Sequence, residues 1–177
     1  FNSARLMADA YQLLFQAYGT CSSPRFAGQV LAGLEMALWD IAGKAAGRPV
    51  HQLLGGAVHD EISYFGFAQG DTAEQVAADA TALAAEGFEV IYVKVGRGDA
   101  LDLDVVRAVR AVTGPDKRMR VDPNEKWSQV QSSRMTRALV EYGVEVVEQP
   151  TRCETVAALA QVRAASPISV SADQSVF

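Results

Sequence analysis

The chain has 177 residues, a formal net charge of −5 and 49% hydrophobic residues. This composition supplies a sizeable core, and the length suits one or two domains. No apolar run approaches the ~20 residues needed to span a bilayer, and the acidic balance argues against nucleic-acid binding. The two cysteines, Cys21 and Cys153, have no metal-binding or redox spacing, so we predict a reduced, cytoplasmic protein.

The first 60 residues are predicted to be helical. Apolar residues recur at helical spacing over residues 3–18 and 25–46, and Gly47 and Pro49 end the second helix. The apolar face of that helix consists of Leu31, Leu34, Leu38 and Ile41. No strand separates the two helices, so we place a domain boundary near residue 60.

From residue 61 onward, apolar strands alternate with amphipathic helices. The predicted strands are 62–67, 90–95, 118–122, 144–148 and 168–173. The predicted helices are 71–86, 100–112, 127–142 and 154–165, and Val112 is expected on the buried side of the second. This repeat is typical of a (β/α) barrel.

Four polar side chains stand near the ends of successive strands. Lys94, Asp122, Glu148 and Asp173 are separated by 28, 26 and 25 residues, the length of one strand, one helix and two loops. Because a barrel gathers the carboxyl ends of its strands at one mouth, we expect the four side chains to converge there. Five strands are present and eight close such a barrel, so we expect a piece of a larger protein that is inactive alone.

Three carboxylates at one mouth repel one another unless a cation neutralises them. Their hard oxygen ligands favour Mg²⁺ on Asp122, Glu148 and Asp173, although each alone suits an exposed loop or a helix cap. Lys94 is a candidate general base, for which its pKa must fall from ~10.4 towards ~7–8. A Schiff-base lysine and a surface lysine are the alternatives.

Three further polar residues are candidates for holding the ligands or the substrate by hydrogen bonds. Tyr92 is two residues before Lys94 and therefore points to the same face of its strand. Asn124 and Gln174 follow the candidate ligands Asp122 and Asp173. Ordinary loop polarity is the alternative for Asn124 and Gln174.

Several short motifs, taken in order, resemble the enolase superfamily, and more closely its mandelate racemase and muconate lactonizing enzyme branch. The early motifs are Gly33-Leu34-Glu35-Met36-Ala37-Leu38-Trp39-Asp40-Ile41, Gly47-Arg48-Pro49-Val50 and Leu53-Leu54-Gly55-Gly56. The strand motifs are Val93-Lys94-Val95-Gly96, Val121-Asp122-Pro123-Asn124, Val147-Glu148-Gln149-Pro150 and Ala172-Asp173-Gln174-Ser175. The resemblance covers roughly residues 25–177.

The resemblance implies a fold and a reaction. Residues 1–60 would be the helical part of an α+β capping domain, and 61–177 the first five strands of a modified (β/α)₈ barrel. It implies Mg²⁺ on the three carboxylates and Lys94 as the base that removes the proton α to a carboxylate, giving an enediolate. Two positions depart from the branch, which usually has Lys at position 92 and Glu at position 174; here they are Tyr92 and Gln174.

These observations predict an isomerase or lyase that racemises, cycloisomerises or dehydrates a small carboxylate. We expect a homo-oligomer with no nucleic-acid or membrane partner. A lysine-dependent aldolase-type barrel and a non-catalytic family member are the alternatives. The second acid or base of the branch would lie outside this sequence.

Overall fold

A computed structural model describes residues 5–6, 8–9, 12 and 24–176 of the chain. Its contacts divide the chain into an N-terminal unit, Phe1–Ile62, and a sheet unit, Ser63–Val176. No helix in the described part of the chain is long and apolar enough to cross a membrane.

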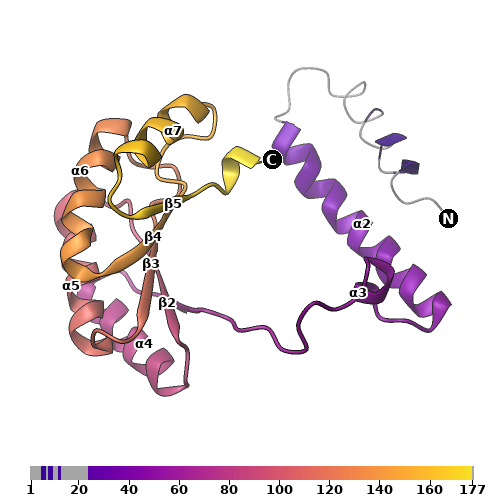
Figure 1. The fold of residues 1–177 in the computed structure, drawn as a ribbon, viewed down its shortest axis with the longest axis horizontal. Helices are drawn as coiled ribbons and strands as arrows, with labels where there is room; N and C mark the ends of the chain where they lie inside the picture. Colours follow the sequence, from indigo (N-terminus) through magenta and orange to yellow (C-terminus); the bar gives the residue numbers. More distant parts are fainter. Residues whose placement is uncertain (1–4, 7, 10–11, 13–23, 177) are drawn as a thin grey trace. The chain divides into compact units, whose positions relative to one another are not determined.

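The sheet unit is built on a five-stranded sheet in which every strand is parallel to its neighbours, in the order β1-β2-β3-β4-β5. The strands are β1 (Gly66–Ala68), β2 (Val90–Lys94), β3 (Arg118–Asp122), β4 (Val144–Glu148) and β5 (Ser169–Ser171). The connecting helices are α4 (Ala73–Ala85), α5 (Asp99–Thr113), α6 (Gln129–Leu139) and α7 (Val156–Ala165), with short 3₁₀ turns η2 (Val140–Tyr142) and η3 (Gln174–Val176). All four helices cover one face of the sheet (Figure 1), which confirms the predicted partial barrel.

Strand alternation separates a buried face from a functional face. Val93, Val121 and Val147 are fully buried in the hydrophobic core. Their neighbours Tyr92 and Asp122 point to the opposite face, as the period of two in a strand requires. The in-register pair Lys94–Asp122 brings the ends of β2 and β3 together.

Two helices of the sheet unit, α4 and α6, begin directly after a capping residue. Thr72 accepts a hydrogen bond from the Gln75 backbone N–H (3.3 Å), and Gln75 Oε1 accepts one from the Thr72 N–H in return. Ser128 and Gln131 repeat this capping box at α6. Each box satisfies N–H groups that a helix start leaves unpaired.

Several sequence predictions in the sheet unit were wrong in detail, and β5 is shorter than the predicted strand 168–173. The first strand begins at Gly66, because Ile62 and Tyr64 lie exposed outside the sheet. Val112 is 47% exposed because it falls at the end of α5, beyond the core. The last two helices begin later than predicted: Ser128 caps α6, and α7 starts at Val156.

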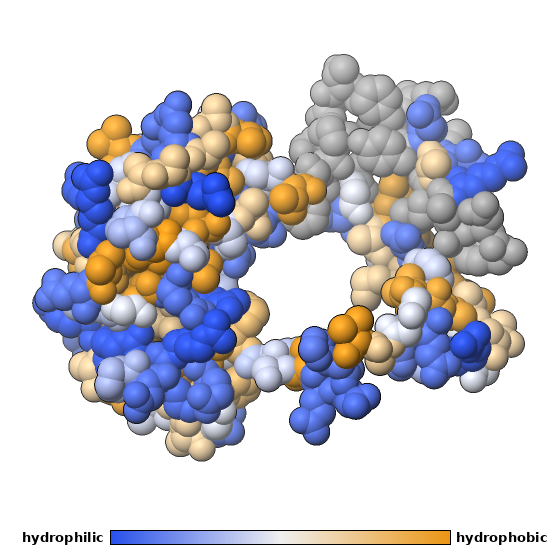
Figure 2. Space-filling view, in the orientation of Figure 1, coloured by the Kyte–Doolittle hydropathy of each residue, from blue (hydrophilic) through white to orange (hydrophobic). Residues whose placement is uncertain are grey.

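The N-terminal unit contains the long helix α2 (Pro24–Ala46) and the short helix α3 (Val50–Leu53). The predicted helix 25–46 is thus present, but on its apolar face Leu31 is buried while Leu34 and Ile41 are exposed. Most of the predicted helix 3–18 lies outside the described residues. Figure 2 shows that hydrophilic side chains cover much of the visible surface of the sheet unit.

Candidate active site

Asp122 is the centre of the candidate site. Its carboxylate is buried, and its Oδ2 accepts hydrogen bonds from Tyr92 Oη (2.9 Å) and Lys94 Nζ. Burial, followed by the charges of Asp122 and Glu148, raises the pKa of Tyr92, so its phenol stays protonated and donates. The Lys94 side chain is half exposed, and its amine is paired with Asp122.

The loop after β3 holds Asp122 from the other side. The Asn124 backbone N–H donates to Asp122 Oδ1 (2.6 Å), and Asn124 Nδ2 donates to Oδ2 (3.1 Å). Asn124 has φ +52° and Glu125 φ +68°, left-handed conformations that few non-glycine residues adopt. This tight turn bends the chain back over the carboxylate it follows.

Glu148 and Asp173 lie at the ends of the next two strand segments. Burial raises the pKa of Glu148; the Tyr92 hydrogen bond and the Lys94 charge oppose the rise, while the charges of Asp122 and Asp173 add to it. The three carboxylates therefore act on one another electrostatically. Their oxygens do not all lie within 4.8 Å of one another.

A different group in the described part of the chain meets that distance: Glu125, Cys153 and Glu154. Glu125 Oε1 accepts a hydrogen bond from the Cys153 backbone N–H (2.7 Å), and Glu154 pairs with Arg152 (3.1 Å). These contacts within and between loops explain why Glu125, Cys153 and Glu154 lie close together. The candidate metal ligands remain the strand-end carboxylates.

Gln149 links Glu148 to Asp173, a role that the sequence analysis missed. The side chain is fully buried, and its Oε1 accepts hydrogen bonds from the backbone N–H groups of Asp173 (3.0 Å) and Ser175 (3.1 Å). Its Nε2 donates to Thr151 O (2.9 Å) and Ser175 Oγ (2.8 Å). The only sequence signal was its place directly after a candidate ligand.

Asp102 was also missed, because it lies on a helix among other acidic residues. It is 1% exposed, and its Oδ1 accepts hydrogen bonds from the backbone N–H groups of Gly96 and Arg97, both 2.9 Å. Its Oδ2 accepts one from Trp127 Nε1 (3.3 Å). Asp102 thereby ties the loop after Lys94 to the loop after Asp122.

Gln174 is buried in η3, and its Oε1 has no hydrogen-bond partner within the described residues. No hydrogen bond joins Gln174 to Lys94, Asp122 or Glu148 in that part of the chain. The structure thus brings Tyr92, Lys94, Asp122 and Asn124 into direct contact. Glu148 interacts electrostatically with Asp122, Lys94 and Asp173.

The donor set suits Mg²⁺. Asp122, Glu148 and Asp173 offer hard carboxylate oxygens from three successive strand ends, the ligand type that Mg²⁺ prefers. Burial first, and then the charges of Asp122 and Asp173, raise the pKa of Glu148, and a divalent cation there would favour the ionised carboxylate. Among the residues that the structure describes, no cysteine or histidine is grouped with these three carboxylates.

Comparisons with known proteins identify relatives of this chain. Residues 75–177 match the enolase C-terminal domain-like family, and residues 3–55 match the mandelate racemase / muconate lactonizing enzyme N-terminal domain. D-galactarolactone cycloisomerase of Agrobacterium fabrum is 34% identical over 79% of this chain and 38% of its own length. Muconate cycloisomerase 1 of Pseudomonas putida is 33% identical over 82% and 39%.

A solved structure is similar as well. The dipeptide epimerase from Cytophaga hutchinsonii, in complex with Mg and the dipeptide D-Ala-L-Val, has a TM-score of 0.75 and 33% identity over 80% of this chain and 38% of its own. These relatives are cycloisomerases and epimerases, which does not support the aldolase-type alternative. The chain spans less than half the length of the relatives it matches. It belongs to the mandelate racemase and muconate lactonizing enzyme family of the enolase superfamily.

Proposed function

We propose that the whole protein is a Mg²⁺-dependent isomerase or lyase that removes the proton α to the carboxylate of a small substrate. The contact between Lys94 and the buried Asp122 carries the proposal, because it puts an amine beside a candidate metal ligand. Division at residue 60 into capping and barrel parts, and a homo-oligomeric state, belong to the same proposal.

In this proposal Asp122, Glu148 and Asp173 hold Mg²⁺. The ion would supply positive charge where negative charge develops on the substrate's carboxylate oxygens, which lowers the barrier by several kcal/mol. Tyr92 and Asn124 fix the Asp122 carboxylate through the hydrogen bonds they donate to it. Gln149 and Asp102 orient the loops that carry the other groups.

Lys94 is the base. An ammonium bonded to Asp122 cannot accept a proton, so Lys94 acts as a base only after it leaves that carboxylate and passes one proton to solvent. With half its side chain exposed, Lys94 can make this movement without disturbing the core. The amine then accepts the α-proton. In an isomerase it returns a proton to the substrate. In a lyase it keeps the proton while the enediolate expels a leaving group.

Incorporation of solvent deuterium tests this function. The whole protein is incubated in D₂O with Mg²⁺ and dipeptides that have one carboxylate, such as D-Ala-L-Val, or two, such as L-Ala-L-Glu, and α-deuteration is followed by NMR. Lys94→Ala should lower exchange by about 10²–10⁴-fold on the face it serves, since that is the usual contribution of a general base. Lys117→Ala, which removes an amine paired with Glu89 at the opposite end of β3, should retain exchange. Undiminished exchange in Lys94→Ala, or full exchange in excess chelator, would overturn the proposal.

A further inference from the structure

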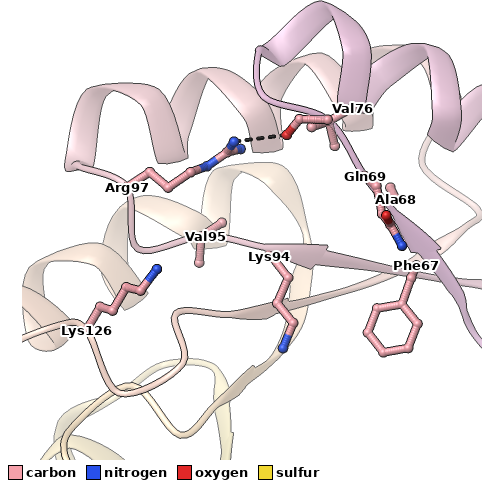
Figure 3. A pocket seen from close by; sticks show the side chains of 9 residues that line it. Phe67, Ala68, Gln69, Val76, Lys94, Val95, Arg97 and Lys126 are labelled. Carbon is pink, nitrogen blue, oxygen red and sulfur yellow. Dashed lines mark hydrogen bonds between the residues drawn. The ribbon is translucent and has the colours of Figure 1, made fainter.

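A cavity of about 470 Å³ opens between the ends of β1 and β2 and the loop after β3. Lys94 borders it, together with Arg97 and Lys126, and Phe67 and Val76 supply apolar walls (Figure 3). Its volume falls within the range of small-molecule sites. Three cationic side chains therefore line one cavity next to the candidate active site.

The cavity carries excess positive charge. None of its lining residues is acidic, among the residues that the structure describes. Two carboxylates that bond to lining residues are engaged in these bonds: Asp79 accepts a hydrogen bond from the Gln69 backbone N–H (2.8 Å), and Asp102 accepts hydrogen bonds from the Gly96 and Arg97 backbone N–H groups and from Trp127. Asp122 neutralises Lys94, so the excess comes from Arg97 and Lys126.

The two remaining cations are placed in different ways. Arg97 Nη1 donates to Gly70 O (2.9 Å) and Asp71 O (3.1 Å), which fixes the guanidinium against the β1–α4 loop and leaves its other nitrogens available. The Lys126 amine has no hydrogen-bond or salt-bridge partner within the described residues. In Figure 3 the Lys94 side chain, at the end of β2, points away from Arg97, which lies in the following loop; both residues line the cavity.

The backbone is shaped to hold Lys126 at this cavity. Gly96 has φ +92°, and a Cβ there would lie 2.7 Å from Pro123 O and 3.1 Å from the Lys126 side chain. Only glycine lets the two loops approach this closely. Lys126 thus packs across the loop that follows Lys94 rather than extending away from it.

We infer that this cavity binds an oxyanion, a carboxylate or phosphate group carried by the substrate at a distance from its reacting carbon. The inference rests on the proposed function, because Lys94 borders both the cavity and Asp122. It assigns the substrate class: small carboxylates with a second anionic group. Arg97 and Lys126 would pair with that group by charge-assisted hydrogen bonds.

Anion binding without metal or turnover tests the inference separately from the proposed function. The whole protein, treated with chelator, is titrated calorimetrically with inorganic phosphate and with succinate at constant ionic strength. Lys126→Gln should weaken binding of the preferred anion about fivefold to tenfold, as loss of one charge-assisted contact predicts. Preference for phosphate identifies a phosphate group on the substrate, and preference for succinate identifies a carboxylate.

Arg137→Gln is the matched control, since Arg137 is an exposed cation on the outer helix α6 and its loss should leave anion binding unchanged. Both substituted side chains are exposed, so both variants should melt at the wild-type temperature. Absence of binding to either anion in the wild type would overturn the inference. An equal loss in Lys126→Gln and Arg137→Gln would overturn it as well, because the attraction would then come from net charge alone.

Discussion

Two glutamates on β4 show how the two ends of the sheet differ. Burial would raise the pKa of Glu145, but hydrogen bonds from Arg120 and Arg118, both 2.7 Å, outweigh it and lower the pKa. Three residues later, burial and the charges of Asp122 and Asp173 raise the pKa of Glu148. At the amino end of β4, ion pairs with arginine favour the charged form of Glu145. At the carboxyl end, burial and neighbouring carboxylates disfavour the charged form of Glu148, which a cation would stabilise.

The largest expected effect concerns Mg²⁺ binding at the carboxyl ends. Asp122→Asn removes a charged ligand candidate and should weaken Mg²⁺ binding at least ~100-fold, above the 10–100-fold typical of residues that only orient a ligand. Calorimetric titration of the whole protein with Mg²⁺ measures it. Glu145→Gln removes the same charge at the other end and should bind Mg²⁺ as the wild type does. If the two variants lose affinity equally, the ends do not differ in function.

A smaller loss of Mg²⁺ affinity is expected from Gln149. Gln149→Met keeps the side-chain volume but leaves the N–H groups of Asp173 and Ser175 unpaired, which should lower Mg²⁺ affinity about tenfold. It should also lower the free energy of unfolding by about 1–3 kcal/mol. Gln161→Met, at an exposed position on α7, is the control. A Gln149→Met protein that binds Mg²⁺ normally would show that Gln149 is structural only.

Neutralising the two glutamates should change stability in opposite directions. In chelator at pH 7, Glu145→Gln should lower the free energy of unfolding by up to ~1 kcal/mol, the usual range for partly exposed ion pairs. Glu148→Gln should raise it, because the raised pKa means that the folded state disfavours the ionised carboxylate. Urea unfolding of both variants measures the two signs. Destabilisation by both substitutions would remove the contrast between the ends.

The pH dependence of the free energy of unfolding in the same two variants is a smaller effect that also distinguishes the two ends of β4. The stabilisation from Glu145 is present above its unfolded pKa of ~4.3 and is lost as pH falls through its lower folded pKa. The destabilisation from Glu148 appears as pH rises from the unfolded pKa through its higher folded pKa, and is absent in acid. Stability differences from the wild type, recorded between pH 3 and pH 8 in chelator, should therefore follow opposite curves.

The strand ends could be predicted from the sequence because apolar runs and a near-constant spacing fix them. The outward position of Val112 and the late start of β1 could not, since they depend on where packing against neighbouring elements stops. The hydrogen-bonding roles of Gln149 and Asp102 could not be predicted for another reason. Their roles arise from backbone N–H groups 24 residues away or on a neighbouring loop, which no local pattern encodes.

Crystallographic location of a bound Mn²⁺ ion tests the central claim most directly. Mn²⁺ accepts the same hard oxygen ligands as Mg²⁺ and gives an anomalous signal that marks its position. Crystals of the whole protein soaked in Mn²⁺ should show an anomalous peak contacting Asp122, Glu148 and Asp173, with Lys94 moved off Asp122. A peak at Glu125, Cys153 and Glu154, with none at the strand ends, would contradict the account.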